Sequence, residues 1–266
     1  MNPVTSLCAE VRERVRIVLF DIDDTITVHG RLPACAYRGI ERLHEADLIT
    51  IAVTGRPAGW CDHIARMWPV DGIVGENGAF YFRYDQANGR MRRRFWLGEG
   101  ERRQNRERLD TIATEVLQCV PAARIASDQA YREADLAVDI CEDVPPLSSE
   151  DIETIHAIFA RHGATTKTSS IHVNGWFGTY DKCSMALRML AAEFGMDEAS
   201  ARARAIYVGD SPNDVPMFEC FEYTVGVANI RQFLPRLRCT PRWVTSSEGG
   251  FGFSEFTDVL LKRGTT

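Results

Sequence analysis

The chain has 266 residues, a formal net charge of −6 and an apolar fraction of 45%. This length allows one large domain, or a core into which a smaller domain is inserted. The acidic balance argues against nucleic acid as a partner, because domains that bind it usually present a basic face. No apolar run approaches the roughly 20 residues of a membrane-spanning helix, so no membrane association is expected.

Cysteine usage and the N-terminal residues predict a cytoplasmic protein. Residues 1–16 include acidic side chains and no long apolar stretch, unlike a secretory signal peptide. The eight cysteines are scattered, and no two have Cys-x-x-Cys spacing, so we expect reduced thiols. The segment from Arg90 to Arg108 holds eight arginines with interspersed glutamates, which is typical of the solvated face of a helix.

Short continuous apolar runs predict strands that are buried on both faces of a parallel sheet. The expected strands lie at 15–20, 48–53, 73–75, 80–84, 205–208, 223–227 and 243–245, with helices at 34–46 and 182–194. Pro57, after the second strand, is well placed to begin a further helix. This alternation predicts an α/β fold, a Rossmann-like doubly wound parallel-sheet core.

The pattern changes after the turn signal Asn88-Gly89. Helices are expected at 101–120 and 149–162, and strands at 136–140 and 168–177. These elements predict a smaller α/β domain inserted into the core. We therefore expect a catalytic core of residues 1–84 and 181–266, and an inserted cap domain of residues 85–180.

Polar side chains follow the predicted core strands where ligands bind in such sheets, at the carboxyl ends. Asp21 and Asp23 follow the first strand, Thr54 follows the second, and Asp210 follows the strand at 205–208. Any one of them could simply cap a helix. Lys182 is a further candidate. Only three of the 31 basic residues are lysines, and lysine and arginine are not interchangeable in a functional site. Together these residues suit phosphoryl transfer.

The proposed chemistry needs a nucleophile and positive charge around the phosphoryl oxygens. Asp21 can attack phosphorus to form an aspartyl-phosphate, which water then hydrolyses. Asp23 can protonate the leaving alcohol and later deprotonate water. Asp21 and Asp210 can ligate Mg²⁺, with Asp214 bracing the site. Thr54 and Lys182 can hold a phosphate oxygen and offset its charge.

Four motifs resemble those of the haloacid dehalogenase superfamily. They are Asp21-Ile22-Asp23-Asp24-Thr25, Thr54-Gly55-Arg56, Lys182 and Gly209-Asp210-Ser211-Pro212-Asn213-Asp214. The resemblance implies a phosphoric monoester hydrolase that uses Mg²⁺. It implies a metal site of Asp21, the backbone carbonyl of Asp23, Asp210 and Asp214, and a phosphate site of Thr54, Gly55, Lys182 and Asn213. Asp24 departs from the family pattern, because many members have glycine there.

The insertion point resembles that of the type 2 cap in the Cof-like and sucrose-phosphatase-like subfamily, as does Glu76-Asn77-Gly78-Ala79. The resemblance implies hydrolysis of a small phosphorylated metabolite, most simply a sugar phosphate. The residues expected to contact this substrate are Arg56, Glu76, Asn77, Arg132, Ser170, His172 and Asn174.

Other functions remain open at this point. A sugar phosphomutase or a phosphotransferase of the same superfamily would use the same four motifs. A non-catalytic protein that binds a phosphorylated ligand is less favoured, because the set of site residues is intact. A response-regulator-like receiver would be roughly half this length and would have no insert. The sequence does not identify the physiological ester or the oligomeric state.

Overall fold

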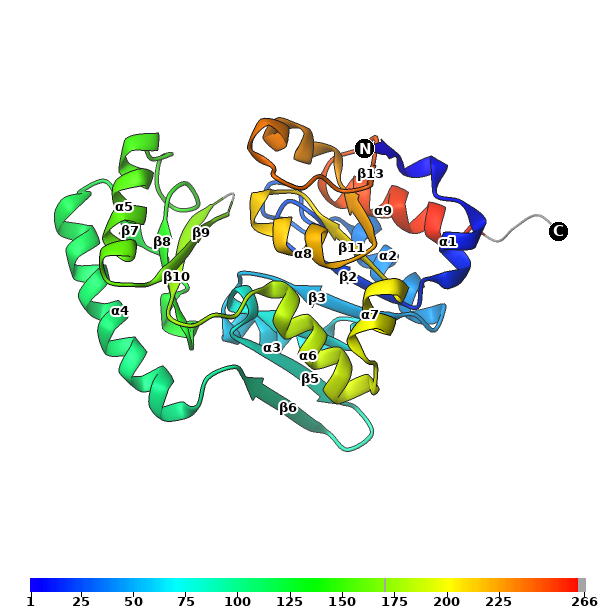
Figure 1. Cartoon of the computed structure of the whole chain (residues 1–266), viewed down its shortest axis with the longest axis horizontal. Coiled ribbons are helices and arrows are strands. Elements are labelled where there is room, and N and C mark those ends of the chain that lie inside the picture. Colours follow the sequence, from blue (N-terminus) through cyan, green and yellow to red (C-terminus); the bar gives the residue numbers. More distant parts are fainter. Residues whose placement is uncertain (170, 263–266) are drawn as a thin grey trace.

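The computed structural model describes residues 1–169 and 171–262 (Figure 1). Nine strands form the larger sheet: β1 (Asn2–Pro3), β2 (Ile17–Phe20), β3 (Ile49–Val53), β4 (Gly72–Gly75), β5 (Phe80–Asp85), β6 (Arg90–Phe95), β11 (Ala205–Gly209), β12 (Tyr223–Gly226) and β13 (Trp243–Val244). Their order is β1-β13-β12-β11-β2-β3-β4-β5-β6, and only the pairs β4–β5 and β5–β6 are antiparallel. The predicted α/β class with a mostly parallel sheet is confirmed.

Helices cover both faces of this sheet. One face carries α2 (Ala34–Glu45), α3 (Ala58–Met67) and α9 (Gly249–Leu260), and the other carries α6 (Lys182–Phe194) and α8 (Val215–Cys220). The short helices α1 (Ala9–Arg14) and α7 (Glu198–Arg204) complete the core. Side chains alternate along β2, so Val18 and Phe20 pack on the first face while Ile17 and Leu19 pack on the second. This double coverage explains why β2 is apolar at every position.

A second, four-stranded antiparallel sheet comprises β7 (Arg124–Ile125), β8 (Asp135–Asp139), β10 (His172–Trp176) and β9 (Thr165–Thr168), in that order. Helices α4 (Glu99–Cys119) and α5 (Ser149–Arg161) cover one face of it. Val173 packs against these helices, whereas His172 and Asn174 alternate to the opposite face. That opposite face lies toward the large sheet (Figure 1).

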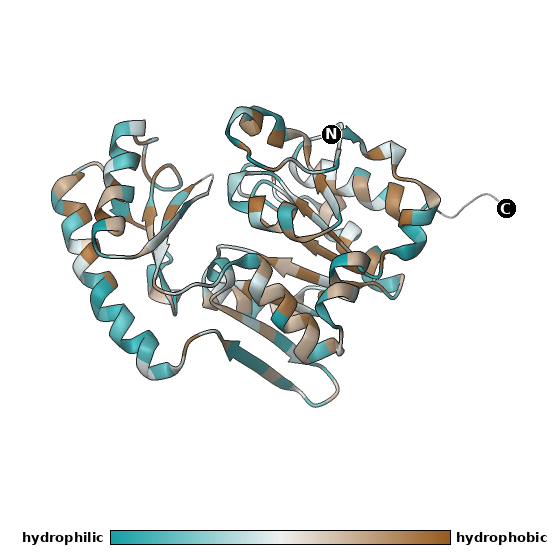
Figure 2. Ribbon diagram, in the orientation of Figure 1, coloured by the Kyte–Doolittle hydropathy of each residue, from teal (hydrophilic) through white to brown (hydrophobic). Residues whose placement is uncertain are grey.

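Two predicted elements differ from the structure. The expected strand at 168–177 is split between β9 and β10, which pair antiparallel with each other. Four of the eight arginines between Arg90 and Arg108 lie in β6 and four in α4, so the prediction of a single helix face is wrong. On β6, Arg92 bonds Asp85 and Glu193, so acids on neighbouring elements allow an arginine-rich edge strand. Figure 2 shows that β6 is strongly hydrophilic.

The division into core and cap is a proposal, and the sheets refine its first boundary. Strand β6, which the sequence analysis assigned to the insert, pairs with β5 in the large sheet. We therefore propose that the cap begins after Phe95, near the start of α4. The second sheet and its two helices form the cap, and the chain returns to the core at Lys182.

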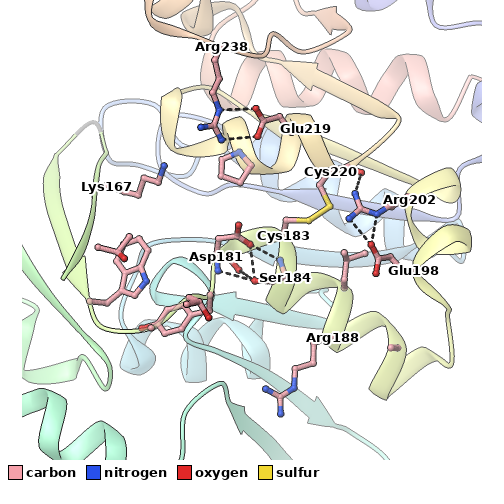
Figure 3. Close-up of a pocket in the computed structure, with 18 residues that line it drawn as sticks. Lys167, Asp181, Cys183, Ser184, Arg188, Glu198, Arg202, Glu219, Cys220 and Arg238 are labelled. Carbon is pink, nitrogen blue, oxygen red and sulfur yellow. Dashed lines mark hydrogen bonds and ion pairs between the residues drawn. A yellow bond between two sulfur atoms is a disulfide. The ribbon is translucent and has the colours of Figure 1, made fainter. Parts of the chain in front are cut away.

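The expectation of reduced thiols is wrong for one cysteine pair. Cys183 and Cys220 form a disulfide that joins α6 to α8 (Figure 3). It links the helix that begins at Lys182 to the helix that follows Asp214. A cytoplasmic protein usually keeps its thiols reduced, so this pair does not support the expected cytoplasmic location. Among the described residues, no helix combines the length and apolarity that a membrane crossing requires.

Candidate active site

Three aspartates converge at the carboxyl ends of two neighbouring parallel strands. Asp21 follows β2 and Asp210 follows β11, and these strands pair in register with Phe20 opposite Val208. Asp214 lies one short turn beyond Asp210. Each of the three offers a carboxylate oxygen, these oxygens lie within 4.8 Å of one another, and all three residues are buried.

Lys182 supplies the positive charge next to this acid cluster. Its Nζ lies 3.1 Å from Oδ1 of Asp21 and 2.8 Å from Oδ1 of Asp214. The side chain is only 2% exposed. Asp181 caps the helix by accepting from the backbone N–H of Ser184, which fixes Lys182 as the first residue of α6. Two of the three carboxylates, those of Asp21 and Asp214, are thus paired with one buried ammonium group.

Burial in this cluster disfavours ionised carboxylates. It raises the pKa of Asp21 to about 7, even though Lys182 opposes the shift. The pKa of Asp210 is raised well above its usual range, first by burial and then by Asp214 and Asp21. A divalent cation would balance the surplus negative charge, and hard oxygen ligands of this kind are those that Mg²⁺ prefers.

Asp214 braces the site through both of its carboxylate oxygens. Oδ1 accepts from Lys182 Nζ and, at 2.5 Å, from the Tyr207 hydroxyl. Oδ2 accepts from the backbone N–H groups of Asp210, at 2.9 Å, and Ser211, at 3.3 Å. Asp214 therefore fixes both the ammonium group and the loop that carries Asp210.

Two of the four predicted phosphate-binding residues, Gly55 and Asn213, line a small cavity of about 20 Å³ between the large sheet and the cap, whereas Thr54 and Lys182 do not line it. It is lined by Asp21, Asp23, Gly55, Arg56, Ser169, Ile171, His172, Asn174, Ser211 and Asn213. Thr54 directly follows β3 and is buried, and its Oγ1 accepts from the backbone N–H of Arg56 at 3.0 Å. A cavity of this size holds about one water molecule, so the cap is closed over the acids.

Arg56 joins the core to the cap at this cavity. Its Nε and one terminal nitrogen donate to both oxygens of Asp23 at 2.9–3.1 Å. The same terminal nitrogen donates to Glu142 of the cap at 2.9 Å, and His172 Nε2 lies 2.9 Å from the other oxygen of Glu142. Glu142 lies in the loop between β8 and α5, where no periodic pattern or motif of the sequence marks it.

The backbone conformation at position 24 explains how an aspartate can stand where the resembled motif often has glycine. The φ of Asp24 is 57°, in the left-handed region where glycine is favoured and aspartate is tolerated. Its backbone N–H donates to Thr27 Oγ1, and its carbonyl accepts from Asn229. The aspartate here therefore occupies the conformation that favours glycine in the family motif.

Three of the predicted substrate residues instead lie in the junction between core and cap. Glu76 is fully buried and accepts from four backbone N–H groups, those of Ala58 in the core and residues 133–135 in the cap. Asn77 has a φ of 55° and donates through its backbone to the Thr54 carbonyl. Arg132 has a fully buried side chain that pairs with Asp128 and Asp135. Of the four remaining predictions, Arg56, His172 and Asn174 line the cavity, and Ser170 lies outside the described residues.

A larger cavity, of about 850 Å³, lies away from the acid cluster, between α6, α8 and the end of the cap (Figure 3). Two of its three arginines are already paired, Arg202 with Glu198 and Arg238 with Glu219. None of Asp21, Asp210 and Asp214 lines it. The small cavity is therefore the candidate active site.

Comparisons with known proteins agree with this geometry. No protein-family model matches the chain. A phosphoglycolate phosphatase from Methanoculleus marisnigri is 28% identical over 251 residues, covering 91% of this chain and 94% of that protein. The crystal structure of Thermoplasma acidophilum 0175 has a TM-score of 0.70 at 17% identity, covering 92% of this chain and 98% of its own.

A solved sugar phosphatase of HAD subclass IIB has a TM-score of 0.60 at 13% identity, covering 87% of this chain and 93% of its own. The fold is therefore shared with this solved sugar phosphatase over most of the chain. The chain thus shares its fold with solved phosphatases of the haloacid dehalogenase superfamily and is similar in sequence to a phosphoglycolate phosphatase.

Proposed function

We propose that the chain is a Mg²⁺-dependent phosphomonoesterase that hydrolyses a small phosphorylated metabolite, a sugar phosphate, through an aspartyl-phosphate. The observation that carries the proposal is the position of Lys182 between Asp21 and Asp214, at 3.1 and 2.8 Å, at the end of the strand pair β2–β11. A buried ammonium group beside a carboxylate nucleophile is suited to stabilising the charge of a phosphoryl group in transfer.

In the first step an oxygen of Asp21 attacks phosphorus and the bond from phosphorus to the ester oxygen breaks. Asp23 donates a proton to the departing oxygen, and the alcohol leaves. In the second step a water attacks the aspartyl-phosphate while Asp23 takes its proton. The bond between phosphorus and Asp21 then breaks and inorganic phosphate is released. Lys182 balances charge in both steps.

The residues fit a bound Mg²⁺, because the cluster holds three buried carboxylates, only two of which pair with the Lys182 ammonium group, and this leaves a surplus of negative charge. Asp21, Asp210 and the backbone carbonyl of Asp23 would hold it. Asp214, which the family motif also implies as a ligand, already uses both oxygens to hold Lys182, Tyr207 and the loop. When bound, the ion would offset the charge of the phosphoryl oxygens.

The closed cap has a consequence for substrate access. A cavity of about 20 Å³ cannot hold a phosphate ester. The contacts of Arg56 with Glu142 and of Arg132 with the Gly55 carbonyl tie the cap to the core. We infer that the cap opens to admit substrate, and that it closes to exclude water from the phosphoryl group while Asp21 attacks in the first step.

Chelation tests the proposal. Phosphate release should be measured with sugar phosphates, nucleotides, 2-phosphoglycolate and flavin mononucleotide in the presence of Mg²⁺. We expect hydrolysis of at least one sugar phosphate, a loss of at least about 100-fold in EDTA, and recovery when Mg²⁺ is restored in excess. Hydrolysis that is unchanged in EDTA would contradict the metal assignment, and turnover of 2-phosphoglycolate alone would contradict the substrate class.

A further inference from the structure

A second cavity, of about 650 Å³, lies directly beside the small catalytic one. Three parts of the chain form it: the loop that follows β2, helix α3 with the residue after it, and a turn of the cap. Its apolar lining consists of Ile22, Leu32, Trp60, Ile64, Trp68 and Tyr131. A phosphate group does not need so large an apolar surface, so the lining points to a further part of the substrate.

Two residues connect this cavity to the catalytic site. Asp23 and Arg56 line both cavities. In the proposed reaction Asp23 donates its proton to the ester oxygen of the leaving group. The leaving group must therefore lie on the Asp23 side of the phosphoryl group, which is the side on which the 650 Å³ cavity lies.

The side chains that line this cavity favour a leaving group that carries a ring over one that carries a negative charge. The Trp60 side chain is 43% exposed, and the Arg56 guanidinium lies 4.4 Å from the centre of its ring. The Arg56 guanidinium already forms ion pairs with Asp23 and Glu142. Among the described residues that line the cavity, the other basic residue is His63. An anionic leaving group would therefore find little free positive charge, whereas an indole face stacks well on a flat apolar surface.

The cap completes this cavity only when it is closed. Tyr131 reaches over α3 from the cap, and a side chain on Gly59 would place its Cβ 2.9 Å from the Tyr131 Cβ. The glycine thus lets the cap turn approach the helix closely. A leaving group held here would be enclosed by both core and cap at the moment when the cap closes over Asp21.

We propose that this cavity is the leaving-group subsite, and that it selects phosphate esters whose alcohol carries a ring with an apolar face. A pyranose and an aromatic ring share that feature, and a short acidic alcohol such as glycolate lacks it. The inference rests on the proposed phosphatase function and assigns Trp60 as the residue that determines specificity.

The test compares kcat/KM for glucose 6-phosphate, benzyl phosphate and 2-phosphoglycolate. Wild type should prefer at least one ring ester. Trp60→Ala should lower kcat/KM for the preferred ring ester about tenfold and change that for 2-phosphoglycolate less than about twofold, and Trp60→Phe should recover most of the loss. Met67→Ala is the matched control, since Met67 lies on the same helix, is exposed and does not line the cavity. Preference between the two ring esters shows whether the ring is a carbohydrate or an aromatic.

Two results would overturn the subsite. One is a wild-type preference for 2-phosphoglycolate over both ring esters. The other is an equal loss for all three substrates in Trp60→Ala, which would show that Trp60 acts only through Arg56. Absence of hydrolysis by wild type would instead contradict the proposed function. In that case calorimetric binding of the ring esters to the protein, with and without Trp60→Ala, still tests the cavity, and equal affinity would exclude the subsite.

Discussion

Replacing Asp21 with asparagine is expected to lower phosphate release by roughly 10⁴-fold or more, because the amide cannot form the acyl phosphate. The side chains have nearly the same shape, so the fold should be retained. Lys182 loses one carboxylate partner but keeps Asp214 at 2.8 Å. Steady-state phosphate release and far-ultraviolet circular dichroism measure the two parts of this prediction.

The same substitution should not lower the stability of the metal-free protein above neutral pH. Burial raises the pKa of Asp21 to about 7, so the folded protein keeps this proton to a higher pH than the unfolded chain does. Ionisation of Asp21 therefore lowers the stability of the metal-free fold as pH rises through about 7. Asparagine removes that loss, and we expect a melting temperature in EDTA at pH 8 no lower than that of wild type.

Asp24→Asn is the matched control for Asp21→Asn. It lies in the same motif, and its left-handed backbone, with φ at 57°, accepts asparagine as readily as aspartate. We expect activity within a few-fold of wild type. Near-wild-type turnover by Asp21→Asn, or an equal loss in both variants, would remove the assignment of Asp21 as the nucleophile.

Replacing Arg132 with methionine is expected to lower the free energy of unfolding by about 3–5 kcal/mol, because it leaves buried carboxylates without their partner. The guanidinium group donates to Asp128 and to Asp135, whose side chain is fully buried, and it also donates to the Gly55 carbonyl of the core at 3.0 Å. Urea unfolding in the presence of Mg²⁺ measures the loss.

Two further variants separate this explanation from a general effect of removing arginine. Arg103→Met breaks an ion pair with Glu99 in which both side chains are more than three-quarters exposed, and we expect no measurable change. Asp135→Asn, added to Arg132→Met, should recover part of the lost stability because it removes the unpaired charge. A change below about 1 kcal/mol in Arg132→Met would contradict a structural role and return Arg132 to the set of substrate contacts.

The sequence predicts the core well because buried parallel strands are continuous apolar runs. Strands β2, β3 and β11 end within one residue of the expected positions, and Asp21, Thr54 and Asp210 follow from those ends. Lys182 stands out because lysine is rare in the chain. These signals are local, and the sheet register then places the residues side by side.

The junction and the cap are harder to predict because their contacts join distant residues. Glu76 and Arg132 are expected from the sequence to contact the substrate, and only the close approach of core and cap buries them in the junction. Strand β6 lacks an apolar pattern because it is an edge strand whose arginines contact acids on other elements. Cys183 and Cys220 are 37 residues apart, and their pairing depends on the packing of α6 against α8.

Trapping of the phosphorylated intermediate tests the central claim most directly. Asp23→Asn should slow hydrolysis of the aspartyl-phosphate, since the water then lacks its base. The variant is mixed with a hydrolysed ester and Mg²⁺, quenched in acid, digested and mapped by mass spectrometry. We expect one phosphoryl group on the peptide that contains Asp21, and none when Asp21→Asn is added. A phosphoryl group on any other residue, or none on the protein during rapid turnover, would contradict the central claim.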